Sequence, residues 1–194
     1  MKTFAVKSIH WDQFELLEEM TDLSYRNLSA LDLNGIILSG REMNETNFSE
    51  TSLRSANLHG AVGEKISFRK ANLYAAILTG ALFDRANFWR AKLNLVQAKH
   101  ISLNRANLGR AELIVSDFSQ AQMEKAHLFR ACLRYTNLSG ANLRTANLID
   151  ADLTGANLCG ADLRGANLTH ANLQDALLQG TLFQGAILEG TTGI

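Results

Sequence analysis

The stretch "ADLTGANLCGADLRGANL" (residues 151–168) repeats one five-residue unit almost without change. Each unit reads Ala, then Asp or Asn, then Leu, then two variable positions. An α-helix repeats its faces every ~3.6 residues and a strand every ~2, so neither element explains a period of five. The sequence therefore indicates a structure in which five residues form one repeating segment.

The same register extends over most of the chain. Steps of five from Leu23 to Leu188 give 34 central positions without insertion or deletion, of which 24 are Leu, six are Phe and two are Met. Only Gly63 and Ala98 interrupt the series. Two residues before each centre, 21 of the 34 positions are Ala, and Asn or Asp dominates the position between them. An unbroken register of this length identifies an internal repeat.

The pattern A-(D/N)-L-x-x resembles that of the pentapeptide-repeat family over about residues 21–190. The resemblance implies an all-β fold, a right-handed four-sided parallel β-helix (a solenoid) with one pentapeptide per side and four per coil. The central residue and the Ala would point inward and the other three positions outward. The repeat is long enough for about 8 coils, which at about 4.8 Å per stacked strand make a rod roughly 40 Å long.

A coil of four units would stack residues that are twenty apart. One column of centres would then hold Phe48, Phe68 and Phe88, an expected aromatic stack. We expect no internal cavity at Gly63 or Ala98, because larger neighbours in the same columns can lean into the space.

The first twenty residues lack the repeat and predict a cap on the first coil. The segment "FAVKSIHW" (residues 4–11) predicts a strand. The segment "DQFELLEEM" (residues 12–20) predicts a short helix that has Phe14, Leu17 and Met20 on one face.

We therefore expect an N-terminal cap over 1–20, the β-helix over 21–190 and a C-terminal tail over 191–194. Arg26 and Arg41 occupy nominally inward positions near the start of the repeat. Because buried unpaired charge is costly, we expect an irregular first coil with both side chains directed to the end of the rod. The C-terminal end shows no second cap, so it predicts either a ragged last coil or a homodimer through the C-terminal coil, as in several members of the family.

Composition excludes several classes of protein. Nineteen basic and nineteen acidic residues give zero net charge, so the chain is neither a basic nucleic-acid binder throughout nor a strongly acidic DNA mimic. Residues 61–130 nevertheless carry 11 basic and 5 acidic side chains. The two cysteines, Cys132 and Cys159, are too few for a disulfide framework and indicate a cytoplasmic protein. The sequence contains neither a secretory signal nor an apolar run of the ~20 residues that span a membrane.

The sequence offers no catalytic constellation. Its five histidines share no metal-ligand spacing, and it has no phosphate-binding loop or dinucleotide motif. A convex rod with a filled interior provides no pocket for convergent catalytic groups. We therefore expect no enzyme activity and assign no catalytic, cofactor-binding or metal-binding residue. The many Asn side chains are interpreted as acceptors for local backbone N–H groups rather than as a recognition ladder.

The side centred on Phe88 and Leu108 has the most unusual outward residues. One outward column of this side, the basic column, holds Lys70, Arg90, Arg110 and Arg130. Four cations stacked about 4.8 Å apart repel one another, so carboxylates, anions or a partner must compensate them. Trp and Phe among Arg are enriched at protein interfaces and also occur where phosphate or nucleic acid binds. In a third interpretation, the Arg stems cover apolar surface and the Trp lies flat against its neighbours. The candidate partner-binding residues are Trp89, Arg90, Arg110, Phe129 and Arg130, together with Tyr135, which falls on the next side, centred on Leu93 and Leu113.

These observations favour a non-catalytic protein–protein interaction scaffold, with nucleic acid or an anionic surface as a less favoured partner. By resemblance it is a cytoplasmic, bacterial, cyanobacterial-type protein. The alternative is the quinolone-resistance branch of the family, whose members bind DNA gyrase as DNA mimics. The chain departs from that branch in its zero net charge, its basic middle section and the absence of loops between repeats.

Overall fold

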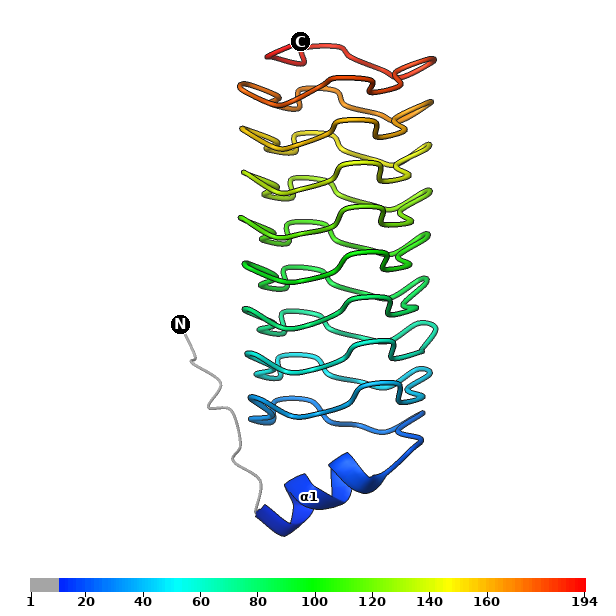
Figure 1. The fold of residues 1–194 in the computed structure, drawn as a ribbon, viewed down its shortest axis with the longest axis vertical. Coiled ribbons are helices and arrows are strands. Elements are labelled where there is room, and N and C mark those ends of the chain that lie inside the picture. The colour runs from blue at the N-terminus through cyan, green and yellow to red at the C-terminus, as the bar shows by residue number, and fades with distance from the viewer. Residues whose placement is uncertain (1–10) are drawn as a thin grey trace.

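The computed structural model describes residues 11–194, with side chains from Phe14 onward. Figure 1 shows a stack of similar coils, with helix α1 (Trp11–Glu19) at the N-terminal end and the C-terminus at the other. Helix α1 is the only helix in the described part of the chain, and no strand there is longer than an isolated bridge. The rest of the chain alternates single-residue parallel bridges with turns.

The bridges confirm the predicted stacking of residues that are twenty apart. The first joins Asp22 to Glu42 and the last joins Asn172 to Thr192, all in parallel orientation. At each step the N–H of a central residue donates to a carbonyl of the next coil, as Leu23 does to Glu42 at 2.7 Å. The fold is therefore a parallel β-helix, and its pairing extends into the segment 191–194 that we expected to be a tail.

Each side ends in a turn that the pentapeptide builds locally. The carbonyl of the central residue accepts from the N–H three residues later, as Leu23 does from Arg26 at 3.2 Å. The residue two after the centre has a positive φ, whether it is glycine or not. The Asn or Asp before the centre accepts through Oδ1 from the N–H two residues on, as Asn87 does from Trp89 at 3.0 Å. The interpretation of the Asn side chains as turn-forming acceptors is confirmed.

The interior is filled by the central residues and the small residues two positions before them. Phe48 and Phe68 stack with ring centroids 5.3 Å apart, and Phe68 and Phe88 with centroids 4.8 Å apart, so the predicted aromatic stack is confirmed. Polar side chains at inward positions satisfy their hydrogen bonds inside the rod: the buried hydroxyl of Thr46 donates to the carbonyl of Leu23 at 2.8 Å.

The interior at Gly63 is occupied, but by a different neighbour from the one expected. A Cβ placed on Gly63 would lie 2.5 Å from Cδ1 of Ile66 and 2.8 Å from the carbonyl oxygen of Met43. Ile66 takes one of the inward positions that Ala usually holds, and its side chain is buried. The missing volume is therefore supplied by the same coil rather than by the side chains stacked above and below.

Helix α1 packs its apolar side onto the first coil. Leu17 is buried, and Phe14 and Met20 pack partly buried against the core. These three residues form the apolar face that the sequence predicts for this helix. The predicted strand over 4–11 lies outside the described residues except for Trp11, which is the first residue of α1.

The first coil keeps the regular ladder of bridges, so the expectation of an irregular coil is wrong. Arg26 is exposed, whereas Arg41 is half-buried and donates from Nη2 to the carbonyl of Glu18 at 2.5 Å. The carboxylate of Glu18 accepts from the N–H of Ile37 at 2.7 Å. Helix α1 therefore provides polar partners at the end of the rod, although Nε of Arg41 is buried without a hydrogen-bond partner in the described part of the chain.

The C-terminal end of the rod has no helix over it among the described residues, and its apolar side chains lie open. In the last coil, three sides have an apolar residue before the centre, where Asn or Asp is usual. The exposed apolar residues at this end are Leu177, Leu182, Ile187, Leu188 and Ile194.

Candidate partner-binding surface

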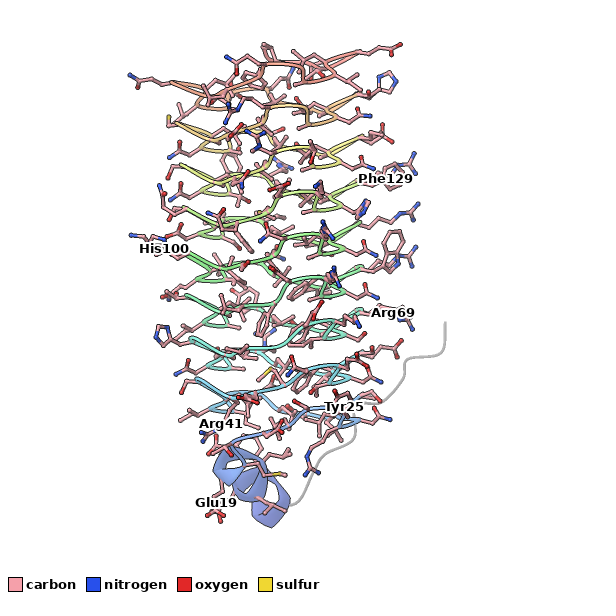
Figure 2. The ribbon with its side chains drawn as sticks, turned by 90° about the vertical axis from the view of Figure 1, so that its right-hand side faces the viewer. Glu19, Tyr25, Arg41, Arg69, His100 and Phe129 are labelled. Carbon is pink, nitrogen blue, oxygen red and sulfur yellow. The ribbon has the colours of Figure 1, made fainter. Side chains whose placement is uncertain are left out.

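Five of the six candidate residues lie on one side of the rod and the corner that follows it. Figure 2 shows Arg69 and Phe129, which share an outward column, projecting from the same edge, with His100 on the opposite edge. Trp89 occupies the same column, and the arginines follow their aromatic neighbours at the turn. We call the surface formed by Trp89, Arg90, Arg110, Phe129 and Arg130 the Arg–aromatic belt.

The indole of Trp89 lies over a glycine in the next coil. Gly109 is buried, and a Cβ placed on it would come within 2.6 Å of Cζ3 of Trp89. Any side chain at 109 would displace the ring, so this glycine provides the seat for the indole. Trp89 is consequently half-buried, with its ring packed against the next coil.

Guanidinium groups gather around the aromatic rings of the belt. The guanidinium carbons of Arg90 and Arg110 lie 5.9 and 5.6 Å from the centroid of the Trp89 ring. Arg130 lies 4.9 Å from the centroid of the Phe129 ring. Each contact is within the range of a cation–π interaction, which contributes about 0.5–1 kcal/mol at an exposed site. The rings therefore hold the guanidinium groups in place at the surface.

Carboxylates compensate the basic column at its two ends only. Lys70 pairs with Glu50 at 3.0 Å, and Nε of Arg130 pairs with Asp150 at 3.1 Å. Within residues 11–194, no carboxylate lies within 4.0 Å of Arg90 or Arg110. The two exposed central arginines thus retain their charge without an internal counterion.

The sixth candidate, Tyr135, lies on the following side, away from the belt. It continues an exposed apolar column with Leu95 and Val115, whose exposed fractions are 43% and 54% against 56% for Tyr135. All three residues have φ between 56° and 60°, a conformation that is strained for a β-branched residue such as Val115. The structure therefore divides the candidates into the belt and this separate apolar column.

The described residues show no arrangement for metal or thiol chemistry. Within residues 11–194 no three His, Cys, Asp or Glu side chains converge to hold a metal ion. Cys132 and Cys159 are free and half-buried, and burial raises the pKa of the Cys132 thiol. None of the helical structure described has the length and apolar character of a membrane-spanning helix.

Sequence reasoning missed an open groove of about 450 Å³ on the side that precedes the belt. The signal for it was present in the sequence, because Val62 and Leu82 stand where Asn or Asp is usual. We call it the Gly63 groove; its lining residues are Asn44, Val62, Gly63, Glu64, Leu82, Asp84, Arg85, Asn104 and Arg105.

Comparison with known proteins relates the repeat to a defined family. The family model for pentapeptide repeats matches in eight copies, over residues 32–62, 65–97, 91–128, 126–165 and 161–192. No curated protein sequence matches the chain.

Several solved structures resemble the chain. The pentapeptide repeat protein Rfr23 from the cyanobacterium Cyanothece 51142 is 41% identical over 50% of this chain and 67% of its own, with a TM-score of 0.48. A trypsin-treated QnrB1, a plasmid-mediated fluoroquinolone resistance protein, is 20% identical over 86% of this chain and 88% of its own, with a TM-score of 0.65. HetL, involved in heterocyst differentiation regulation in the cyanobacterium Nostoc sp. strain PCC 7120, is 28% identical over 96% and 97%, with a TM-score of 0.44. The likeness to QnrB1 supports a right-handed β-helix and concerns the fold alone.

Proposed function

Because this chain belongs to the pentapeptide-repeat family, we propose that it is a non-catalytic scaffold that binds another protein through the Arg–aromatic belt. The belt would be displayed on a rigid rod of about 8 coils with α1 as its N-terminal cap. The observation that carries the proposal is the pair of exposed arginines, Arg90 and Arg110, held beside Trp89 without a carboxylate partner.

A protein partner suits the belt better than a nucleic acid. The basic column runs only from Lys70 to Arg130, a span of roughly 15 Å at about 4.8 Å per coil. Glu50 and Asp150 close it at both ends. A longer basic stripe is typical of nucleic-acid binding. Half-buried aromatic rings beside arginine, in contrast, are the groups that contribute most at protein interfaces.

The proposal is tested by affinity capture with a belt variant and a control that reverses one charge elsewhere on the rod. The belt variant combines Trp89→Ala, Arg90→Glu and Arg110→Glu, and the control variant carries Lys99→Glu, an exposed cation away from the belt. We expect a partner that is recovered with the wild type and the control but lost from the belt variant. Equal recovery of every protein with all three baits would contradict the proposal.

The alternative partners predict different results. Binding of the belt to DNA, RNA or anionic vesicles would weaken steeply as salt is added, because it would depend on released counterions. Gyrase binding would protect DNA supercoiling from a fluoroquinolone or inhibit it at micromolar protein. We expect neither effect, since the chain lacks the strong net charge that each alternative requires.

The exposed apolar residues of the last coil favour self-association as a second proposal. Leu177, Leu182 and Ile187 are 57%, 38% and 50% exposed, which is unusual for large apolar side chains gathered at one end. We expect a two-fold homodimer through this end. Light scattering after size exclusion should give twice the mass of the chain. A variant with Leu177→Asn, Leu182→Asn and Ile187→Asn should have the mass of the monomer. A monomeric wild type would rule out the dimer.

We place the protein in a reducing compartment such as the cytoplasm. The two cysteines are free, which suits a reducing environment. Localisation of a tagged full-length chain in its own cells would test this assignment.

A further inference from the structure

The Gly63 groove combines three features that the fold itself does not use. The first is an apolar floor. Val62 and Leu82 stack in one outward column and remain 39% and 50% exposed. Their neighbours in the same column, Glu42 and Ser102, are polar. Two large apolar side chains at the surface of a hollow are the usual floor of a binding site rather than of a solvated one.

The second feature is an unused backbone donor at the centre of the groove. Within residues 11–194, the N–H of Asp84 donates to no protein acceptor. Leu82 offers no side-chain oxygen, and the carboxylate of Glu64 is engaged by Arg85 at 2.8 Å. In four other coils the equivalent N–H, of Asn44, Glu64, Asn104 or Glu124, donates to a side-chain oxygen twenty residues earlier at 2.9–3.0 Å. In three more, the N–H of Ser24, Arg144 or Arg164 donates to the Asp or Asn two residues earlier.

The third feature is a cation without a counterion. Three cations of the column that borders the groove pair with carboxylates at 2.8–3.4 Å: Lys65, Arg85 and Lys125. Arg105 has no carboxylate within 4.0 Å in the described part of the chain. Asp84 stands in the same position relative to Arg105 as Glu64 does relative to Arg85. Its carboxylate does not pair with Arg105 but accepts from Ser102 Oγ at 2.6 Å and from the N–H of Asn104 at 3.0 Å.

We propose that the Gly63 groove binds an extended segment of a partner protein in which an apolar side chain lies two residues from an acidic one. Side chains two residues apart in an extended segment share one face. The apolar side chain contacts Val62 and Leu82, and the acidic one pairs with Arg105. A backbone carbonyl of the segment accepts from the N–H of Asp84. The carboxylates of Glu64 and Asp84 are already engaged inside the protein, so the charge of Arg105 is left for the ligand.

This groove is a site separate from the Arg–aromatic belt, because its lining residues come from the preceding side of the rod. Its volume of about 450 Å³ falls in the range of ligand sites, about 300–1,000 Å³. The two sites can therefore be tested independently, and failure of one leaves the other standing.

The test uses a variant that restores the usual repeat. Val62→Asn with Leu82→Asn removes the apolar floor and gives the N–H of Asp84 an internal acceptor, since Asn is the common residue at these positions. We expect this double variant to fold as the wild type does, as shown by circular dichroism. Arg105→Gln removes the cation alone. Ile77→Asn is the matched control, because it makes the same change at the equivalent position of another side.

The probe is a phage library of random seven-residue peptides, selected on the full-length wild type and counter-selected on the double variant. We expect enriched peptides with an apolar residue two positions from Asp or Glu. In fluorescence polarisation their affinity should fall at least about tenfold with the double variant and with Arg105→Gln. It should be unchanged in Ile77→Asn and in Trp89→Ala. The inference is overturned if no peptide distinguishes the wild type from the double variant, or if the enriched peptides lack an acid or ignore Arg105→Gln.

Discussion

At the scale of single residues, the seat of Trp89 shows how an absent side chain positions an aromatic ring. Gly109 has an ordinary backbone conformation, so its role here is space rather than flexibility. The indole covers this space and in turn carries the guanidinium groups of Arg90 and Arg110. One small residue in the next coil thus organises the central part of the belt.

Gly109→Ala should therefore displace the Trp89 ring while leaving the fold intact. The added Cβ would stand 2.6 Å from Cζ3 and 2.7 Å from Cε3 of the ring, so the ring must move. In a Trp11→Phe background, we expect a red-shifted emission of Trp89, stronger quenching by acrylamide and a loss of stability below about 1 kcal/mol. An unchanged spectrum would show that the ring does not rest on Gly109.

Asp162 provides a pH-dependent contribution to stability. Its hydrogen bonds from the Arg164 side chain, at 2.7 and 2.9 Å, lower the pKa of the carboxyl to about 2. Because the pKa is lower in the folded than in the unfolded chain, the stabilisation is present above about pH 4 and is lost as the pH falls through about 2. Asp162→Asn should lower the urea midpoint at pH 7 and lower it much less near pH 2, where the folded carboxyl is half protonated.

Asn at 162 keeps an acceptor for the turn N–H, so this variant removes the charge alone. Asp152→Asn is the matched control, since Arg134 lies farther from that carboxylate, at 3.9 Å. If the difference in urea midpoint between the wild type and Asp162→Asn were the same at pH 7 and at pH 2, the assignment of the pH-dependent stabilisation to Asp162 would be contradicted.

At the scale of elements, α1 covers the apolar end of the rod and gives polar partners to its first coil. Leu17 is buried in this contact, whereas Leu16 is 57% exposed. Leu17→Ala should cost about 2 kcal/mol of unfolding free energy, and Leu16→Ala less than about 0.5 kcal/mol. Urea unfolding followed by circular dichroism measures both. Equal effects would mean that α1 does not pack through the face described.

Much of this architecture is predictable from the five-residue period, and the limits of that prediction are physical. The period fixes which residues stack, so the column of Phe48, Phe68 and Phe88 follows from the sequence. It also places Tyr135 on the side after the belt, but it does not fix how an outward side chain leans, so the position of the Trp89 ring over Gly109 could not be read from it. The Gly63 groove was missed although Val62 and Leu82 mark its place in the sequence, because its shape and its unused backbone donor depend on how the surrounding side chains lean and bond.

At the scale of the whole molecule, the twenty-residue coil is the unit that can be removed. Deleting residues 161–180 joins Gly160 to Thr181, and Gly160 and Gly180 have nearly the same φ, 68° and 72°. We expect the shortened chain to retain its circular dichroism spectrum and cooperative unfolding, with somewhat lower stability because one interface between coils is lost.

Deleting residues 161–178 is the control of nearly equal size. Eighteen residues are not a multiple of five, so every downstream centre would face outward. We expect this variant to lose ordered structure at its C-terminal end and to aggregate. Similar behaviour of the two deletions would show that the register does not govern the fold.

The aromatic stack has a consequence for the folding process. All four sides present nearly the same small and large inward residues, so a coil that pairs five residues out of step would bury almost as much apolar surface as the correct one. Such a mispaired coil is a kinetic trap with little thermodynamic penalty. The rings of Phe48, Phe68 and Phe88 meet only when three successive coils are correctly aligned. We expect their contact to favour the native alignment of these three coils over its near-equivalents as the rod forms.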